Sequence, residues 1–207
     1  RTAKSLGCRS VAFTYNEPAI FHEYAVDTAK ECRKLGIKTV AVTAGYVCAD
    51  PRKEFYAWMD AANVDLKGFT EEFYKKYTDS SLAPVLETLQ YIKKETSTWL
   101  EITTLLIPGL NDSEKELQGL TTWIAKNLGP DIPLHFSAFH PAHKLLDIPS
   151  TPPSALLKAR EIALTNGLRY CYTGNIEDPE HESTFCHACG KKLIGRNGYA
   201  LGGWNLK

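Results

Sequence analysis

The sequence lacks an excess of either charge and lacks any long apolar run. Its 207 residues carry 24 Lys and Arg against 24 Asp and Glu, with both signs mixed along the chain. A nucleic-acid or anionic-membrane surface would need a basic stripe, so we expect no nucleic acid and no membrane among the partners. No apolar stretch is long enough to cross a bilayer. The length and composition indicate a globular protein of one domain, long enough to carry a small appendage.

Methionine is also nearly absent, and none begins the chain. Met59 is the one methionine, and residues 1–7 have the pattern of a helix end that closes at Gly7. We therefore expect that natural sequence precedes Arg1. A targeting peptide in that region would not be visible in these residues.

Clustered cysteines are scarce. Of six cysteines, four stand singly in apolar or helical surroundings: Cys8, Cys32, Cys48 and Cys171. A free cysteine in such surroundings behaves as a small buried apolar residue. Scattered thiols in a mid-sized chain are typical of a reducing compartment, so we expect a cytoplasmic protein.

What the sequence does contain is a regular alternation of strand and helix patterns. Strands are predicted at 10–15, 39–43, 63–66, 100–106, 134–138 and 168–172, with helices at about 19–35, 51–61, 71–77, 82–94, 114–127 and 152–165. This alternation predicts an α/β fold of parallel strands joined by helical crossovers. No Gly-x-Gly-x-x-Gly follows the first strand, so we favour an incomplete TIM-like (βα) barrel over a dinucleotide-binding sheet.

Two segments of different composition follow from this pattern. Residues 1–175 are predicted to form the partial barrel, without its first strand and the loop after it. The composition becomes polar near Asn175, so residues 176–207 are predicted to be a C-terminal tail that begins with a linker.

Polar residues follow several of the predicted strands. In a parallel barrel the carboxyl ends of the strands form the functional face, because the following loops converge there. The residues at these ends that we expect around one cavity are Asn16, Glu17, Thr43, Asp65, Lys67 and His140, with Gly45 allowing close approach to the backbone. Carboxylates beside a lysine suit a zwitterionic ligand.

Each of these residues also has a structural interpretation. Asn16, Glu17 and Pro18 could form only a turn before a helix whose first turn favours a carboxylate. Asp65 and Lys67 could neutralise each other, and His140 could be a hydrogen-bonded loop histidine. The occurrence of all of them at strand ends favours the functional interpretation.

Cys186 and Cys189 form the one close cysteine pair. Two thiolates at this spacing, followed by Gly190, are typical of a zinc knuckle. A closed zinc site needs four ligands, and the chain contains no second pair. His181, His187 or residues upstream of Arg1 could complete it. Two reduced thiols or a local disulfide are the alternatives.

Several stretches, in order along the chain, resemble the radical S-adenosylmethionine (SAM) enzymes. The similarity is greatest to the branch with the pyruvate formate-lyase activating enzyme and the AmmeMemoRadiSam radical enzymes. The matching stretches are 13–18 (FTYNEP), 42–46 (VTAGY), 63–67 (NVDLK), 106–112 (LIPGLND), 135–141 (HFSAFHP), 172–175 (YTGN), 186–190 (CHACG) and 196–199 (RNGY). They cover nearly the whole chain.

The resemblance implies a function and a cofactor site. Tyr15-Asn16-Glu17-Pro18 stands where the family has a Gly-Gly-Glu-Pro tip that contacts the methionine amino group of SAM. Thr43, Asp65, Lys67 and His140 would lie around the same cofactor. The resemblance implies that SAM is cleaved reductively to a 5′-deoxyadenosyl radical that abstracts hydrogen from a substrate. The enzyme would be a glycyl-radical-type activase or a relative with another substrate.

One departure from the family concerns its 4Fe-4S cluster. The family binds the cluster through a Cys-x3-Cys-x2-Cys motif, which this sequence does not contain. We expect these ligands upstream of Arg1, so the full-length protein would be the oxidoreductase and this chain alone would be inactive. The resemblance further implies an electron donor such as flavodoxin or ferredoxin. It does not name the protein or small-molecule substrate.

Two other functions remain open from the residues alone. A Schiff-base lyase could use Lys67 as its nucleophile, because a desolvated lysine has a lowered pKa. A non-catalytic scaffold with a zinc knuckle could instead bind a protein partner.

Overall fold

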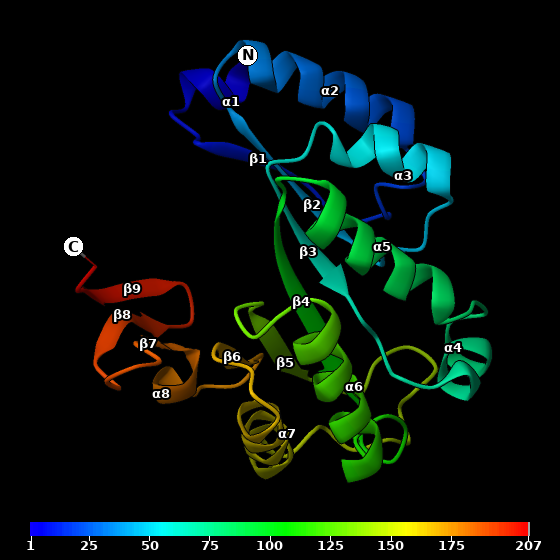
Figure 1. Ribbon diagram of the computed structural model, residues 1–207, viewed down its shortest axis with the longest axis vertical. Coiled ribbons are helices and arrows are strands. Elements are labelled where there is room, and N and C mark those ends of the chain that lie inside the picture. The colour runs from blue at the N-terminus through cyan, green and yellow to red at the C-terminus, as the bar shows by residue number, and fades with distance from the viewer. Residues whose placement is uncertain (207) are drawn as a thin grey trace. The chain divides into compact units, whose positions relative to one another are not determined.

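The structure is a computed structural model that describes residues 1–206. The predicted alternation of strands and helices is present (Figure 1). In chain order the elements are α1 Thr2–Ser5, β1 Ser10–Phe13, α2 His22–Lys34, β2 Lys38–Thr43, α3 Ala49–Tyr56, β3 Ala61–Asp65, α4 Glu71–Tyr77, α5 Ala83–Glu95, β4 Trp99–Leu106, α6 Glu114–Asn127, β5 Leu134–Ala138, α7 Pro153–Thr165, β6 Cys171–Gly174, α8 Pro179–Glu182, β7 Thr184–Phe185, β8 Lys192–Asn197 and β9 Ala200–Trp204.

Strands β1 to β6 belong to one sheet, in the order in which they occur along the chain. The pairs β1–β2, β2–β3 and β5–β6 are parallel, with Ala12 beside Val40, Val42 beside Asn63 and Phe136 beside Thr173. Among the described residues β1 and β6 end this order, and no pairing closes it. The predicted α/β class is confirmed, and the open order fits an incomplete barrel.

The chain divides into two compact units. The first contains Arg1–Leu66 and Ser80–Ile102, and the second contains Lys67–Asp79 and Thr103–Lys207. Strand β4 begins in the first unit and ends in the second. The predicted division into 1–175 and 176–207 stays a prediction.

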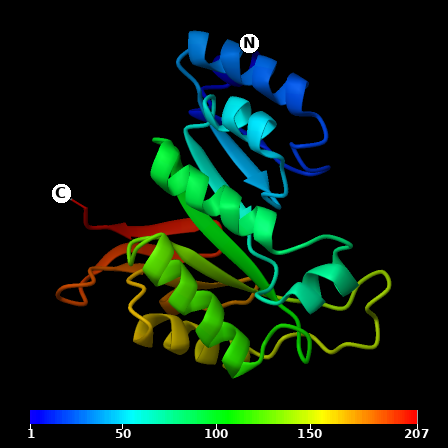
Figure 2. The same cartoon turned by 45° about the vertical axis from the view of Figure 1, so that its right-hand side comes forward.

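In the first unit helices α2 and α3 lie side by side (Figures 1 and 2). Helix α2 turns Ala25, Val26, Ala29 and Cys32 inward, at the spacing of one helical face. The helix is followed by Gly36 at φ 68°, a conformation that glycine adopts without steric cost.

In the second unit helices α6 and α7 pack together, and α7 contacts both β5 and β6. Leu134 and Phe136 of β5 are fully buried, as are Leu120 and Ile124 of α6. The predicted limits of α7 and β5 agree with the structure to within a residue. Ser113 caps α6, since its hydroxyl accepts the Glu116 N–H at 3.3 Å.

The tail holds a small sheet that the sequence analysis treated as a linker and a turn. Strands β7, β8 and β9 pair antiparallel, with Thr184 beside Ile194 and Asn197 beside Ala200. The strands are short and glycine-rich, so they lack the apolar alternation by which strands are predicted. A Cβ atom on Gly195 would lie 3.1 Å from the Gly203 nitrogen, which explains why glycines occur in this pair.

Several predicted boundaries were wrong. Helix α2 begins at His22, not near residue 19, because Tyr15, Asn16 and Glu17 all have positive φ and delay the helix. Helix α3 begins at Ala49, with Cys48 as N-cap, and ends at Tyr56, whereas the sequence predicted a helix over 51–61. Strand β6 begins three residues later than predicted, so that Thr173 and Gly174 pair within the sheet.

No helix of the described chain has the length and apolarity that a membrane span requires. All six cysteines are free. The cytoplasmic location stays a prediction.

Candidate functional site

The segment after strand β1 has an unusual backbone. Tyr15, Asn16 and Glu17 have φ values of 53°, 55° and 42°. Each residue with a side chain in this left-handed region costs about 1–2 kcal/mol. Three in succession persist only where the surrounding structure fixes them, and such strain concentrates at functional sites.

The Glu17 carboxylate is fixed by three donors. Oε1 accepts a hydrogen bond from the Thr43 hydroxyl and a longer one of 3.3 Å from the Ala19 N–H. Oε2 accepts the Ala44 N–H at 2.7 Å. A carboxylate offers about four lone-pair directions, so one acceptor position is left for a ligand.

Strand β2 ends at this carboxylate. The Thr43 hydroxyl donates to Glu17 and accepts the Gly45 N–H at 3.0 Å. Gly45 has φ 68°, and a Cβ atom there would lie 2.8 Å from Cγ1 of Val64. The Thr43–Gly45 turn therefore depends on glycine for both its conformation and its close packing.

Helix α3 places a buried phenol and a buried guanidinium in the same unit. Burial raises the pKa of Tyr56, and the negative charge of Glu17 raises it further, while Arg52 opposes the change. Tyr56 therefore stays neutral. Sequence analysis missed this pair, although Arg52 and Tyr56 are four residues apart and thus on one face of a helix.

Arg52 is only 9% exposed and incompletely paired. Its guanidinium donates to the Thr88 hydroxyl at 3.4 Å and lies 3.7 Å from the Glu87 carboxylate. Its Nε atom is buried without a hydrogen-bond partner. Together with Glu17 it places opposite charges around Tyr56.

Asp65 is the last residue of β3 and is partly buried. Its neighbour Val64 pairs with Thr43 of β2, so Asp65 follows directly beyond the strand position next to Thr43. Among the predicted residues, Asn16, Glu17, Thr43 and Asp65 belong to the first unit. The structure joins Glu17 directly to Thr43.

Lys67 and His140 belong to the second unit. That they share one cavity with the other four residues stays a prediction. Lys67 lies two residues beyond the end of β3.

The backbone around Lys67 is fixed by side chains. The Lys67 N–H donates to the Tyr74 hydroxyl at 3.2 Å, and its carbonyl accepts Nδ2 of Asn111 at 2.7 Å. The Phe69 N–H donates to Oε1 of Glu116 at 2.6 Å. The loop after β3 is thus fixed by three side chains.

Sequence analysis assigned no such role to Asn111 or to the side chain of Glu116. Asn111 is 2% exposed and also accepts the Ile107 N–H at 2.7 Å. Burial raises the pKa of Glu116, the Phe69 N–H opposes this change, and Asp112 adds to it. The cue available in the sequence was the Pro-Gly-Leu-Asn-Asp segment, whose polar residues follow a buried strand.

His140 is exposed and hydrogen bonded on both ring nitrogens. Nδ1 lies 3.2 Å from the Ser150 hydroxyl, and Nε2 lies 3.2 Å from the Asn175 carbonyl. This is the arrangement that the loop-histidine interpretation describes. A cofactor role for His140 stays a prediction.

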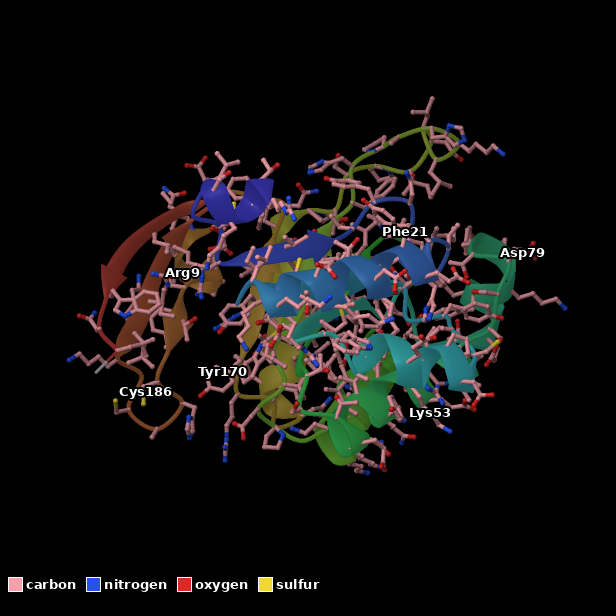
Figure 3. The ribbon with its side chains drawn as sticks, turned by 90° about the horizontal axis from the view of Figure 1, so that it is seen from above. Arg9, Phe21, Lys53, Asp79, Tyr170 and Cys186 are labelled. Carbon is pink, nitrogen blue, oxygen red and sulfur yellow. The ribbon has the colours of Figure 1, made fainter. Side chains whose placement is uncertain are left out.

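Cys186 lies in the turn after β7 (Figure 3). Hydrogen bonds from the Ala188 and Cys189 backbone and from the Cys189 side chain lower the pKa of the Cys186 thiol, and desolvation opposes them weakly. The lowered pKa favours the thiolate, which is the form that binds metals. Cys186 and Cys189 are both free.

A cavity of about 580 Å³ occurs elsewhere in the first unit. It is lined by residues at the amino ends of the strands, such as Lys38 and Asp60, and by residues of helices α2, α3 and α5, among them Tyr56. Glu17 and Thr43 lie at the opposite, carboxyl ends. Of the residues predicted around the cofactor, none lines this cavity.

The described residues contain no group of three or more Cys, His, Asp or Glu side chains that could bind a metal ion. They do not fit a 4Fe-4S cluster.

The chain is similar to several known proteins. The family described as the radical SAM superfamily matches residues 1–120. An uncharacterised protein of Methanocaldococcus jannaschii is 41% identical over 189 residues, which cover 91% of this chain and 56% of that protein. The 4-hydroxyphenylacetate decarboxylase activating enzyme of Clostridium scatologenes is 29% identical over 56% of this chain and 38% of that enzyme.

Among solved structures, a domain of a pyruvate-formate lyase-activating enzyme from Bacteroides vulgatus has the same fold. Its TM-score is 0.70 at 18% identity, over 80% of this chain and 99% of that domain. This chain spans about half the length of the curated relatives it matches. The family match covers more than half of the chain and agrees with the fold, so the chain belongs to the radical SAM superfamily.

Proposed function

We propose that the full-length protein binds SAM and cleaves it reductively, so that the resulting 5′-deoxyadenosyl radical abstracts hydrogen from a substrate. The observation that carries this proposal is the Glu17 carboxylate. Three donors fix it, and one acceptor position remains. An ammonium group is a suitable donor for that position, since hydrogen bonds between charged groups are the strong ones.

The residues of the first unit would orient SAM. Glu17 would accept from its amino group, and Thr43 keeps the carboxylate in place. Asn16 and Asp65 would add polar contacts beside it. Lys67 and His140 belong to the same proposal through the family resemblance, with Lys67 placed by Asn111 and Tyr74.

We extend the proposal to activation of a glycyl-radical enzyme. The support is the sequence similarity to the 4-hydroxyphenylacetate decarboxylase activating enzyme. The substrate would then be a partner protein, and an electron donor such as flavodoxin or ferredoxin would be needed. No observation on Lys67 favours the Schiff-base lyase.

The test uses full-length protein reconstituted anaerobically with iron and sulfide. With SAM and dithionite we expect 5′-deoxyadenosine above background. Glu17→Gln should raise the Kd for SAM by about 10-fold or more, since hydrogen bonds to charged groups contribute about 1.5–3 kcal/mol. Glu31→Gln is the matched control, because Glu31 is an exposed carboxylate on α2 paired with Lys34.

No 5′-deoxyadenosine from an iron-loaded full-length protein would contradict the proposal. Equal SAM affinity in Glu17→Gln and Glu31→Gln would contradict the role of Glu17 alone. Residues 1–207 by themselves should give no product, since their described part holds no cluster ligands.

A second proposal concerns the tail, where Cys186 and Cys189 would bind zinc. The support is their x2 spacing and the backbone hydrogen bonds that Cys186 accepts. Zinc analysis of the full-length protein, with Cys189→Ser for comparison, tests it. Equal zinc content in both proteins would contradict it.

A further inference from the structure

Tyr15 combines a strained backbone with a side chain that has no partner among the described residues. Its φ is 53°, in the left-handed region where a side chain costs free energy and glycine does not. The side chain is 86% exposed and makes no hydrogen bond, ion pair or ring contact with residues 1–206. No such interaction within these residues therefore offsets the cost of a tyrosine in this conformation.

Glu17, two residues later, has a similar backbone but a different balance. Its φ is 42°, and three donors hold its carboxylate. Hydrogen bonds to a charged group are strong, so they stabilise the conformation of Glu17 within the chain. Tyr15 lacks this compensation. A residue kept in a costly conformation without an internal gain points to a contact with a ligand or a partner.

Tyr15 lies at the same edge of the sheet as the Glu17 carboxylate. Strands β1 and β2 are parallel, with Phe13 beside Ala41. Tyr15 and Thr43 each follow this pair by two residues, and the Thr43 hydroxyl donates to Glu17. Two residues of chain span at most about 7 Å, so the Tyr15 ring is within reach of a ligand bound to the Glu17 carboxylate.

The ligand proposed for Glu17 carries a second positive charge besides its amino group. In SAM three carbon atoms separate the amino group from a sulfonium, which has no N–H or O–H and so cannot donate an ordinary hydrogen bond. The face of an aromatic ring attracts such a cation, as it attracts quaternary ammonium groups. A carboxylate and an exposed ring side by side thus offer one partner for each cationic group of SAM.

We propose that the face of the Tyr15 ring binds the sulfonium group of SAM while the Glu17 carboxylate binds its amino group. The contact is electrostatic, and no bond forms or breaks in it. It gives the site a preference for SAM over S-adenosylhomocysteine, in which a neutral thioether replaces the sulfonium. This inference rests on the proposed function, because it requires SAM at Glu17.

The first test measures the Kd of the full-length protein for SAM and for S-adenosylhomocysteine by anaerobic equilibrium dialysis. Tyr15→Leu should raise the Kd for SAM about 3- to 30-fold, the range that cation–π energies give. The Kd for S-adenosylhomocysteine should change by less than about twofold, since a thioether has no charge. Tyr15→Phe keeps the ring and should retain most of the affinity for SAM.

Tyr24→Leu is the matched control. Tyr24 is 71% exposed, lies on α2 in the same unit and has an ordinary helical backbone. This variant should bind both ligands like the wild-type protein.

The second test is thermal unfolding of the full-length protein without ligand. Tyr15→Gly should raise the Tm by about 2–4 °C, because glycine adopts the left-handed conformation without steric cost. Tyr15→Leu keeps a side chain in that conformation and should leave the Tm near the wild-type value. A lower Tm for Tyr15→Gly would show that the ring packs against another part of the full-length protein, which would overturn its assignment to SAM.

The outcomes separate this inference from the proposed function. Glu17→Gln should weaken the binding of both ligands, because both carry the amino group. If Glu17→Gln weakens binding but Tyr15→Leu leaves the Kd for SAM unchanged, the sulfonium contact alone is overturned. Equal losses of affinity for both ligands in Tyr15→Leu would also overturn it. Absence of binding of either ligand to the wild-type protein would instead refute the proposed function, and this inference with it.

Discussion

Strands β5 and β9 have five residues each and differ completely in burial. Every second residue of β5 is buried, whereas every residue of β9 is exposed. Burying an apolar side chain contributes about 1.5–3 kcal/mol, so β5 is stabilised by the removal of Leu134 and Phe136 from water. Strand β9 relies on backbone pairing and on the β7–β8 turn. One chain thus contains a sheet stabilised by burial and a sheet that needs another source of stability.

A similar contrast separates two polar sites. At Glu17 the backbone and a hydroxyl fix a carboxylate, whereas at Lys67 and Phe69 side chains fix a backbone. The first arrangement leaves one acceptor position of the carboxylate open, to which we have proposed that a ligand binds. The second arrangement fixes the backbone of the loop after β3 and does not involve the side chains of Lys67 and Phe69.

The largest expected effect sharpens the contrast between the two sheets. Phe136→Ala should lower the free energy of unfolding by about 3–5 kcal/mol, because a fully buried ring leaves a cavity. Leu201→Ala in β9 should change it by less than about 0.5 kcal/mol, as surface substitutions do. Urea unfolding followed by circular dichroism measures both. Equal losses of unfolding free energy in the two variants would show that the tail has a core.

Glycine substitutions compare a closely packed turn of the first unit with an open turn of the tail. Gly45→Ala should cost about 2–4 kcal/mol, because it combines a left-handed residue with a contact of 2.8 Å to Val64. Gly198→Ala, at φ 55° with open space around it, should cost only about 1–2 kcal/mol. Thermal unfolding of the two variants measures both costs. A larger loss of stability in Gly198→Ala than in Gly45→Ala would contradict the prediction.

Glu116 tests how far buried polar contacts contribute to the second unit. Glu116→Ala should cost about 1–3 kcal/mol, since it leaves the Phe69 N–H unpaired. Glu116→Gln keeps an acceptor and should be nearly neutral at pH 7. Because the pKa of Glu116 is raised, the wild-type protein should lose stability as pH rises from the ordinary carboxyl pKa through the raised one. Glu116→Gln should lack that slope.

The smallest expected effect concerns Asp178, at the start of the tail. Burial opposes ionisation of Asp178, but hydrogen bonds from His181 and Thr173 outweigh it and lower its pKa. Its contribution is present above the ordinary value of 3.8 and is lost as pH falls through the lowered pKa. Unfolding at pH 6 and pH 3 should show a loss of about 1 kcal/mol in wild type that Asp178→Asn lacks. Asp131→Asn, which alters an exposed ion pair, should retain it.

The sequence predicted the elements that have strong local signals. Helix α7 follows its proline pair, α6 follows Ser113, and β5 has an apolar alternation with clear turns at both ends. It missed β7–β9 because their glycines and polar residues carry no strand pattern. It misplaced the start of α2 because three residues with side chains adopt the left-handed conformation.

Part of the candidate site could be predicted from the sequence, and part could not. The pairing of Glu17 with Thr43 follows from strand ends that meet at one edge of a parallel sheet. The roles of Arg52, Tyr56, Asn111 and Glu116 could not be predicted, because each acts across elements distant in sequence.

The sequence alone determined the α/β class, the family resemblance and the cysteine pair, because periodicity, short motifs and spacing are local properties of a chain. The tertiary structure decided which donors hold Glu17, which side chains fix the loop after β3, and how β9 pairs with β8. These depend on hydrogen bonds between residues far apart in sequence, whose geometry exists only after the sheet has formed.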